Sequence, residues 1–248
     1  GGSIRGASVK NCAMGLYLGS SRVVAMDVNC SGATIVPRMP HSGIGVYLIS
    51  GCHAQLYNVN CSGAGRHALQ LTSGATAWLV GGDLSGAGGS AILMSGGSTV
   101  YATGINASGA GSRAVDASGG SVVAIFKSNL SRAGERALSA SSASEIKVNG
   151  CNLTGAGDAS PFRVFSASKI SMSSCTLDQT ALSSVNSGGE IAIYDCVDED
   201  GNPYVVKGNI PVNTMTRPGI LRGIAPTCRE TGNSSVSILP SDPALIYL

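Results

Sequence analysis

Short patterns of alternating apolar and polar residues recur along the chain at a nearly constant distance. Leu69 and Leu71 form one such pair, and after a Ser/Gly turn Ala77 and Leu79 form the next. Two-residue alternation is typical of β-strands whose alternate side chains face a core. The pattern predicts two short strands in each unit. The residues expected to face the interior include Leu69, Leu71, Leu79, Ile92, Val115, Val123, Ile125, Leu138, Ile146 and Val148.

A repeat of 23 residues underlies this pattern, because variants of Ser-Gly-Ala-Gly begin at positions 62, 85, 108, 131 and 154. Strands this short cannot bury a face alone, but stacked units pair each strand in parallel with its equivalent and enclose a continuous core. The sequence therefore predicts an all-β fold, a right-handed parallel β-helix (solenoid) of about eight coils. Recurrent Gly and Ser, and the absence of a 3.6-residue period, exclude a helical alternative.

An Asn or Asp precedes each of these turns by two residues: Asn60, Asp83, Asn106, Asn129 and Asn152. Asn tolerates the left-handed conformation of a tight turn, and its amide can bond to its neighbour one coil away. We expect both features here. Asp83 would then accept from the flanking amides, which favours a structural over a functional role.

Two parts of the chain are expected. Residues 1–196 form the solenoid, interrupted by a loop around Val36 to His41, where two prolines fall in a longer spacing. Residues 197–248 are rich in proline and end on an apolar run, so they are interpreted as a C-terminal capping or oligomerisation element with β-prone pieces at 204–206 and 235–239. The first residues lack the features of a signal peptide and are expected to be a boundary inside a larger protein.

Composition excludes several partners. Charged residues make up 12% of the chain and the formal net charge is +2, which disfavours nucleic-acid binding. No apolar run is long enough to span a bilayer, so no membrane insertion is expected.

The eight cysteines fall into columns of the repeat rather than into sequence pairs. Stacked positions could satisfy disulfide geometry, but free thiols packed as small apolar residues are the preferred interpretation. There is no Cys-x-x-Cys, and His41, His53 and His67 occupy different columns. We therefore expect no metal site and no cofactor.

Charged residues gather on two adjacent units, at Arg113, Asp116, Arg132, Glu135 and Arg136. One interpretation is a salt-bridged surface. The other is a site for an acidic sugar, contacted by Arg113 and Arg136, or for glycosidic cleavage with Asp116 and Glu135 as the catalytic pair.

Trp78 and Tyr101 occupy equivalent outward positions on adjacent units, although aromatic residues are only 4% of the chain. Such a pair suits stacking against sugar rings or packing against another subunit. Val80, Leu93 and Ala124 are expected to add exposed apolar surface. If the two faces line one groove, these aromatic rings and the charged cluster would form a single glycan site.

Four features, which together cover roughly residues 9–210, point to a known family. They are the repeat length, the Asn turns, the Ser/Gly-rich surface of low charge and the distinct C-terminal element. In these features the chain resembles the pectate-lyase-like β-helix domains of bacteriophage tailspikes and tail fibres. The resemblance implies a homotrimer of the virion tail, assembled in the host cytoplasm, that binds and often cleaves bacterial surface polysaccharide outside the cell. The calcium-binding carboxylates of pectate lyases have no counterpart, since Asp83, Asp116 and Asp158 form no aligned cluster.

Two classes of function follow. In the first, the chain is expected to be a receptor-binding domain for bacterial polysaccharide, and any enzymatic activity would be that of a polysaccharide depolymerase, either a hydrolase or a lyase. Alternatively, it is a structural trimeric shaft or an adhesin domain without catalytic activity.

Overall fold

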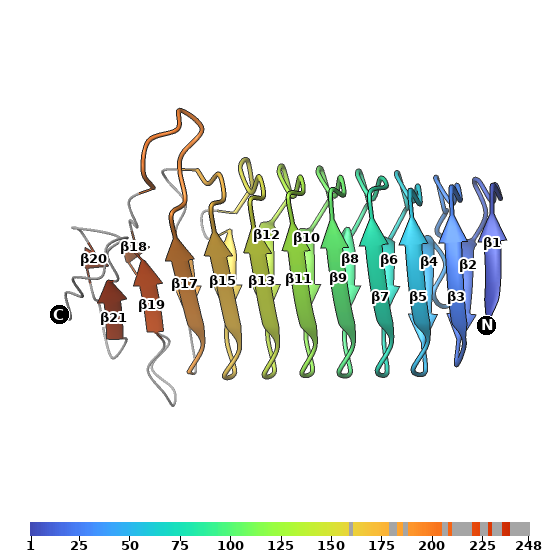
Figure 1. Cartoon of the computed structure of the whole chain (residues 1–248), viewed down its shortest axis with the longest axis horizontal. Helices are drawn as coiled ribbons and strands as arrows, with labels where there is room; N and C mark the ends of the chain where they lie inside the picture. Colours follow the sequence, from blue (N-terminus) through green and yellow to red (C-terminus); the bar gives the residue numbers. More distant parts are fainter. Residues whose placement is uncertain are drawn as a thin grey trace.

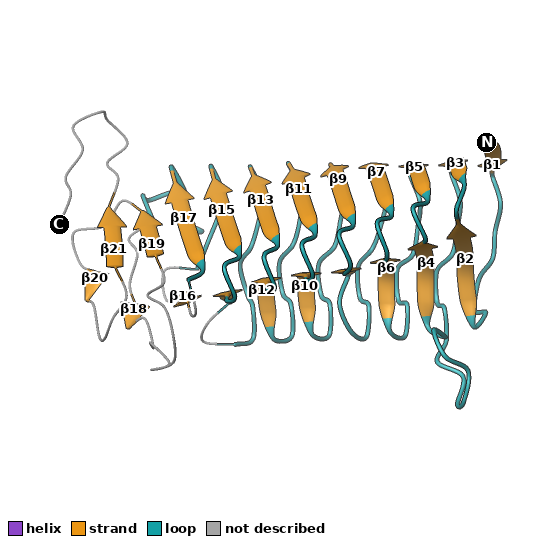
Figure 2. Ribbon diagram, turned by 90° about the horizontal axis from the view of Figure 1, so that it is seen from below, coloured by secondary structure: helices purple, strands orange, loops and turns teal. Residues whose placement is uncertain are grey.

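Each coil of the chain contributes one strand to each of two parallel sheets (Figures 1 and 2). The computed structural model describes residues 1–158, 161–178, 183–185 and 188–204, together with the backbone of four short strands after them. The described part is all-β, with about eight solenoid turns, as the sequence predicts. No helix in that part is long and apolar enough to cross a membrane.

The larger sheet, here called the long sheet, has eleven strands in the order of their odd numbers. Its strands are β1 (Gly2–Arg5), β3 (Arg22–Met26), β5 (His53–Tyr57), β7 (Thr76–Val80), β9 (Thr99–Thr103), β11 (Val122–Phe126), β13 (Glu145–Asn149), β15 (Lys169–Ser173), β17 (Glu190–Tyr194), β19 (Ile220–Gly223) and β21 (Ser235–Ile238).

The smaller sheet, here called the short sheet, has eight strands and uses the even numbers. Its strands are β2 (Met14–Gly19), β4 (Ile44–Ile49), β6 (His67–Leu71), β8 (Ile92–Met94), β10 (Arg113–Ala117), β12 (Arg136–Ala140), β14 (Phe162–Val164) and β16 (Ser183–Val185). In the middle of both sheets each residue pairs with the residue 23 positions further on, as Ile92 does with Val115.

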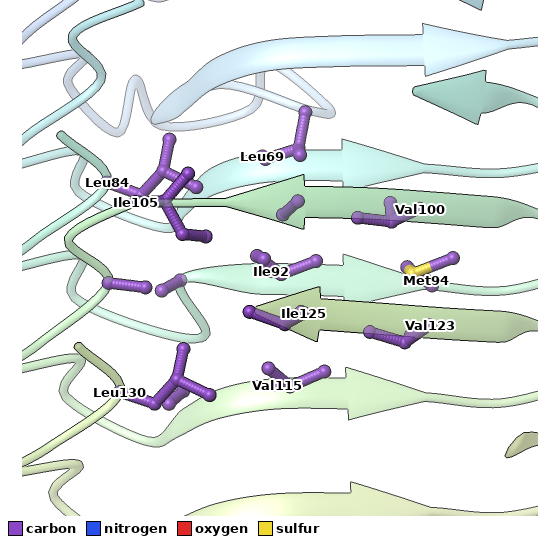
Figure 3. Packing of buried hydrophobic residues seen from close by; sticks show 14 of the residues in the cluster. Leu69, Leu84, Ile92, Met94, Val100, Ile105, Val115, Val123, Ile125 and Leu130 are labelled. Atoms are coloured by element: carbon purple, nitrogen blue, oxygen red, sulfur yellow. The ribbon is translucent and has the colours of Figure 1, made fainter. Parts of the chain in front are cut away.

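The core lies between the two sheets, where side chains from successive coils interleave (Figure 3). All ten residues predicted to face inward are buried, with Leu69, Ile92, Val115 and Leu138 fully inaccessible to solvent. Because alternate residues of a strand point to opposite sides, the two-residue period alone places these side chains inside. The prediction of the inward face is confirmed.

The Asn column works differently from the expectation. None of Asn60, Asn106, Asn129 or Asn152 has a positive φ; these residues form parallel bridges with the adjacent coils. In each, the side-chain oxygen accepts the backbone N–H two residues later, at 2.9–3.4 Å. The left-handed conformation falls instead three residues after the Asn. The residues there are Gly63, Gly86, Gly109, Arg132 and Gly155.

Asp83 takes its place in this column as a hydrogen-bond acceptor. Its Oδ1 accepts the Ser85 N–H at 3.0 Å and the Asn106 amide at 3.1 Å. The expected structural role is therefore supported, and the bond to Asn106 links the two coils through their side chains.

A loop excursion separates the third and fourth strands. Residues 31–43 form the expected excursion, which projects from the rod between β3 and β4 (Figure 2). Ser42 closes it by accepting the Val36 N–H and donating to the Met39 carbonyl, both at 2.9 Å.

At the C-terminal end, β19 and β21 extend the long sheet in parallel beyond β17, and β18 (Gly208–Asn209) pairs with β20 (Cys228–Arg229). The division into two domains at residue 196 stays a prediction. The β-prone piece predicted at 235–239 corresponds to strand β21 over Ser235–Ile238. Val205, Val206, Leu239 and the apolar residues 244–248 lie outside the described residues.

Candidate functional site

A column of aromatic rings stands on the outer face of the long sheet. Trp78 on β7 pairs in register with Tyr101 on β9, and both side chains are exposed by more than two fifths. Their rings are nearly parallel, with centroids 6.1 Å apart and planes inclined by 15°. His53, at the start of β5, extends the column, with its ring 6.5 Å from Trp78 and inclined by 21°.

A groove opens beside this column over the first strands of the long sheet. It has a volume of about 650 Å³ and is lined by Arg22 and Val24 of β3, His53 and Gln55 of β5, Trp78 of β7 and residues 1–3. Parallel pairing places β1, β3, β5 and β7 side by side, so residues distant in sequence meet here. The groove therefore combines one indole face with several hydrogen-bonding groups.

Arg22 and His53 line the groove but were not among the site residues predicted from the sequence. A signal was present, because His53 lies two residues before Gln55 and must share its outward face under the two-residue period. The position of Arg22 depended on the 31-residue spacing of the loop excursion, which shifts the register of β3 and β5 away from the 23-residue repeat.

The apolar surface around the rings is smaller than expected. Val80 and Phe126 are exposed, but Ala124 is only 8% exposed and Leu93 is half-buried. Ala124 lies between Tyr101 and Lys147 in the register of the sheet, so larger neighbours cover its methyl group. The expectation that Ala124 is exposed is wrong.

The charged cluster lies on the short sheet and forms a chain of ion pairs. Arg113 Nη1 contacts Asp116 Oδ2 at 2.5 Å, and Arg136 Nη2 contacts Asp158 Oδ2 at 2.7 Å. Glu135 lies between the two guanidinium groups, at 3.8 Å from Arg113 and 4.0 Å from Arg136. Asp158 was not assigned to this cluster from the sequence.

This arrangement neutralises the predicted catalytic carboxylates. Asp116 is engaged by Arg113 and Glu135 faces both arginines, while the Nε atoms of Arg113 and Arg136 are buried without a hydrogen-bond partner. Arg132 takes no part in the ion pairs of the described cluster; its left-handed backbone places it in the turn column. The geometry favours the interpretation as a salt-bridged surface, and the catalytic roles of Asp116 and Glu135 stay a prediction.

The aromatic column and the charged cluster belong to different sheets. Trp78 and Tyr101 lie on the long sheet, whereas Arg113, Asp116 and Arg136 lie on the short sheet, with the core between the two (Figure 2). The two groups therefore do not line one groove, and the combined glycan site expected from the sequence is not formed within one chain.

The seven described cysteine thiols are free. Stacking brings Cys30 next to Cys61, and a hydrogen bond with the Cys30 thiol together with burial raises the pKa of Cys61. The side chain of Cys228 lies outside the described residues. No group of three or more His, Cys, Asp or Glu suited to a metal ion occurs among the residues that the structure describes.

Comparison with known proteins identifies the fold family. The family model described as "Right handed beta helix region" matches residues 39–197, which is well over half of the chain and includes Trp78, Tyr101 and the charged cluster. Searches of curated proteins and of solved structures found no match.

Proposed function

Because the chain belongs to the right-handed β-helix family, whose fold is common in polysaccharide-binding or polysaccharide-degrading proteins, we propose that it binds a bacterial surface polysaccharide. In this proposal it acts as a receptor-binding domain of the phage tailspike or tail-fibre type, located in the virion tail. The glycan lies along the outer face of the long sheet.

The groove beside the aromatic column carries this proposal. Flat aromatic rings suit the C–H faces of sugars, and Trp78 offers the largest exposed ring of the chain. Gln55, His53 and Arg22 provide hydrogen-bonding groups around it. A volume of about 650 Å³ falls within the range of small-molecule sites and fits a short oligosaccharide segment.

Binding is better supported than cleavage. A glycosidase needs one carboxyl group that holds a proton and a second one free to act as base or nucleophile. Asp116 and Glu135 both face arginines on the short sheet, away from the groove. The proposal is therefore a binding domain, and depolymerase activity is an outcome of its test.

The test compares binding of a panel of purified capsular and O-antigen polysaccharides by the intact chain and by Trp78→Ala. Tyr17→Ala is the matched control, because Tyr17 is an exposed ring on β2 of the short sheet, outside the groove. Loss of the indole face should weaken binding about tenfold, corresponding to the worth of one stacked ring. Tyr17→Ala should bind as the unmodified chain does.

Equal binding by all three proteins, or binding to no polysaccharide, would overturn the proposal. Reducing-end release by the intact chain that Asp116→Asn abolishes would instead establish a depolymerase, with its site on the short sheet.

One observation favours a second function, a structural trimeric shaft. Val80 and Phe126 are exposed on the same face as Trp78, and such apolar surface also suits contact with another subunit. In a shaft, this face would be buried between subunits and the intact chain would bind no polysaccharide.

A further inference from the structure

Charge is distributed unevenly along the chain. The first 82 residues contain five Lys/Arg and a single carboxylate, Asp27, a formal charge of +4. The remaining residues contain eleven Lys/Arg and thirteen Asp/Glu, a formal charge of −2. A positive potential at one end of a rod raises the local concentration of anionic ligands there.

The groove lies within this positive part. Of the described residues that line it, none is Asp or Glu, and its one permanently charged side chain is that of Arg22. Arg22 is exposed and pairs in register with His53, whose ring stands beside Trp78. The groove thus holds a guanidinium group on β3 and the indole ring on β7, with β5 and its His53 ring between them.

Arg22 belongs to a column of in-register residues that runs along the long sheet, and in later coils the charged side chains of this column form ion pairs. Glu145 contacts Lys147 at 2.9 Å, and Lys169 contacts Glu190 at 3.4 Å on the next coils. Among the described residues, Arg22 forms no such ion pair and donates no side-chain hydrogen bond. Its donors therefore remain available to a ligand in the groove.

We propose that the groove selects an acidic polysaccharide, one whose repeating unit bears a carboxylate. The inference rests on the proposed glycan binding and adds the class of glycan. The fork of Arg22 binds the sugar carboxylate in bidentate fashion, while Trp78 packs against a sugar ring of the same segment. Arg22 is thus the specificity-determining residue and Trp78 the general contact.

The experiment uses one polysaccharide in two forms, a uronic-acid-containing capsular polysaccharide before and after chemical reduction of its carboxyl groups. Affinities of the intact chain are measured at low and at physiological salt. The acidic form should bind about tenfold more tightly than the reduced form, because a charge-assisted bidentate contact is lost on reduction. The difference should shrink as salt is added.

Two arginine variants separate a specific contact from net charge. Arg22→Gln should bind both forms equally, at the affinity of the reduced form. Arg66→Gln removes the same charge from an exposed residue of the same basic region outside the groove, and it should retain the preference. Trp78→Ala should lose affinity for both forms.

The outcomes distinguish this inference from the proposed function. If the intact chain binds both forms equally and Trp78→Ala weakens both, the acidic selection is wrong and glycan binding stands. If Arg66→Gln loses the preference as Arg22→Gln does, selection comes from net charge and the Arg22 contact is wrong. If neither form binds while another polysaccharide of the panel does, the acidic selection is wrong; if no polysaccharide binds, the proposed function itself fails.

Discussion

Glycine serves two separate purposes in the turns of this solenoid. At Gly63, Gly86 and Gly109 the backbone is left-handed, a conformation that costs other residues about 1–2 kcal/mol. In a second column the backbone φ is negative, but the coils approach so closely that no side chain fits. On each residue of this column, an added Cβ would lie 2.3–2.4 Å from the carbonyl oxygen of the equivalent glycine one coil earlier. The column consists of Gly88, Gly111, Gly134 and Gly157.

Gly111→Ala should therefore destabilise the chain by about 3 kcal/mol, the upper end of the cost of overpacking. The added methyl group meets backbone, which cannot rotate away, so the coils must separate. Gly120→Ala is the control, since its φ is +75° and its added Cβ would meet nothing within 4 Å. That variant should cost only about 1 kcal/mol. Urea denaturation measures both, and an equal or smaller loss at Gly111 would contradict the close approach of the coils.

At the scale of the strand, the sequence allowed the inward residues to be predicted because alternation has a direct geometric meaning. Leu69 and Leu71 must share a face, and burial of that face is what forms the strand. The turn Asn residues were misread for a related reason. Asn suits both a left-handed turn and a capped extended position, and only the following Gly, or Arg132 in its place, shows where the backbone reverses.

His67, the first residue of β6, provides a titration test of the short sheet. Its Nδ1 accepts the Ser90 N–H at 3.1 Å, which requires the neutral ring. Burial lowers its pKa, the positive charge of Arg66 adds to this shift, and the negative charge of Asp116 opposes it. Below the ordinary value of 6.5 the unfolded chain therefore binds more protons than the folded chain.

Stability should accordingly fall as the pH decreases from about 6.5, and the contribution of His67 should be constant above it. His67→Gln should reduce this acid-induced loss, because a Gln side chain does not titrate. Urea midpoints measured between pH 5 and 8 test the prediction. Parallel curves for the two proteins over that range would show that His67 does not carry the dependence.

At the scale of the molecule, the sequence could not relate the two outward faces to each other. A two-residue period assigns Trp78 and Asp116 to the outside, but it does not give the angle through which the chain turns between the two strands of a coil. That angle depends on turn geometry and on the width of the core. The groove likewise depended on the register of β3 with β5, which the loop excursion sets.

The last prediction concerns assembly. We expect a homotrimer in solution, because Val80 and Phe126 expose apolar surface that favours association. Charged residues are only 12% of the chain, which is too few to prevent self-association by charge repulsion. Each pairwise interface should exceed roughly 1,000 Å², the lower bound for a stable contact. Sedimentation velocity at micromolar concentration should give three times the 24.8 kDa mass of the chain.

Phe126→Asp, which places a carboxylate within that surface, should shift the distribution to monomer, whereas Lys127→Asp on the adjacent turn should leave the trimer intact. A monomeric intact chain would reject the prediction, and a trimer unaffected by Phe126→Asp would place the interface on another face.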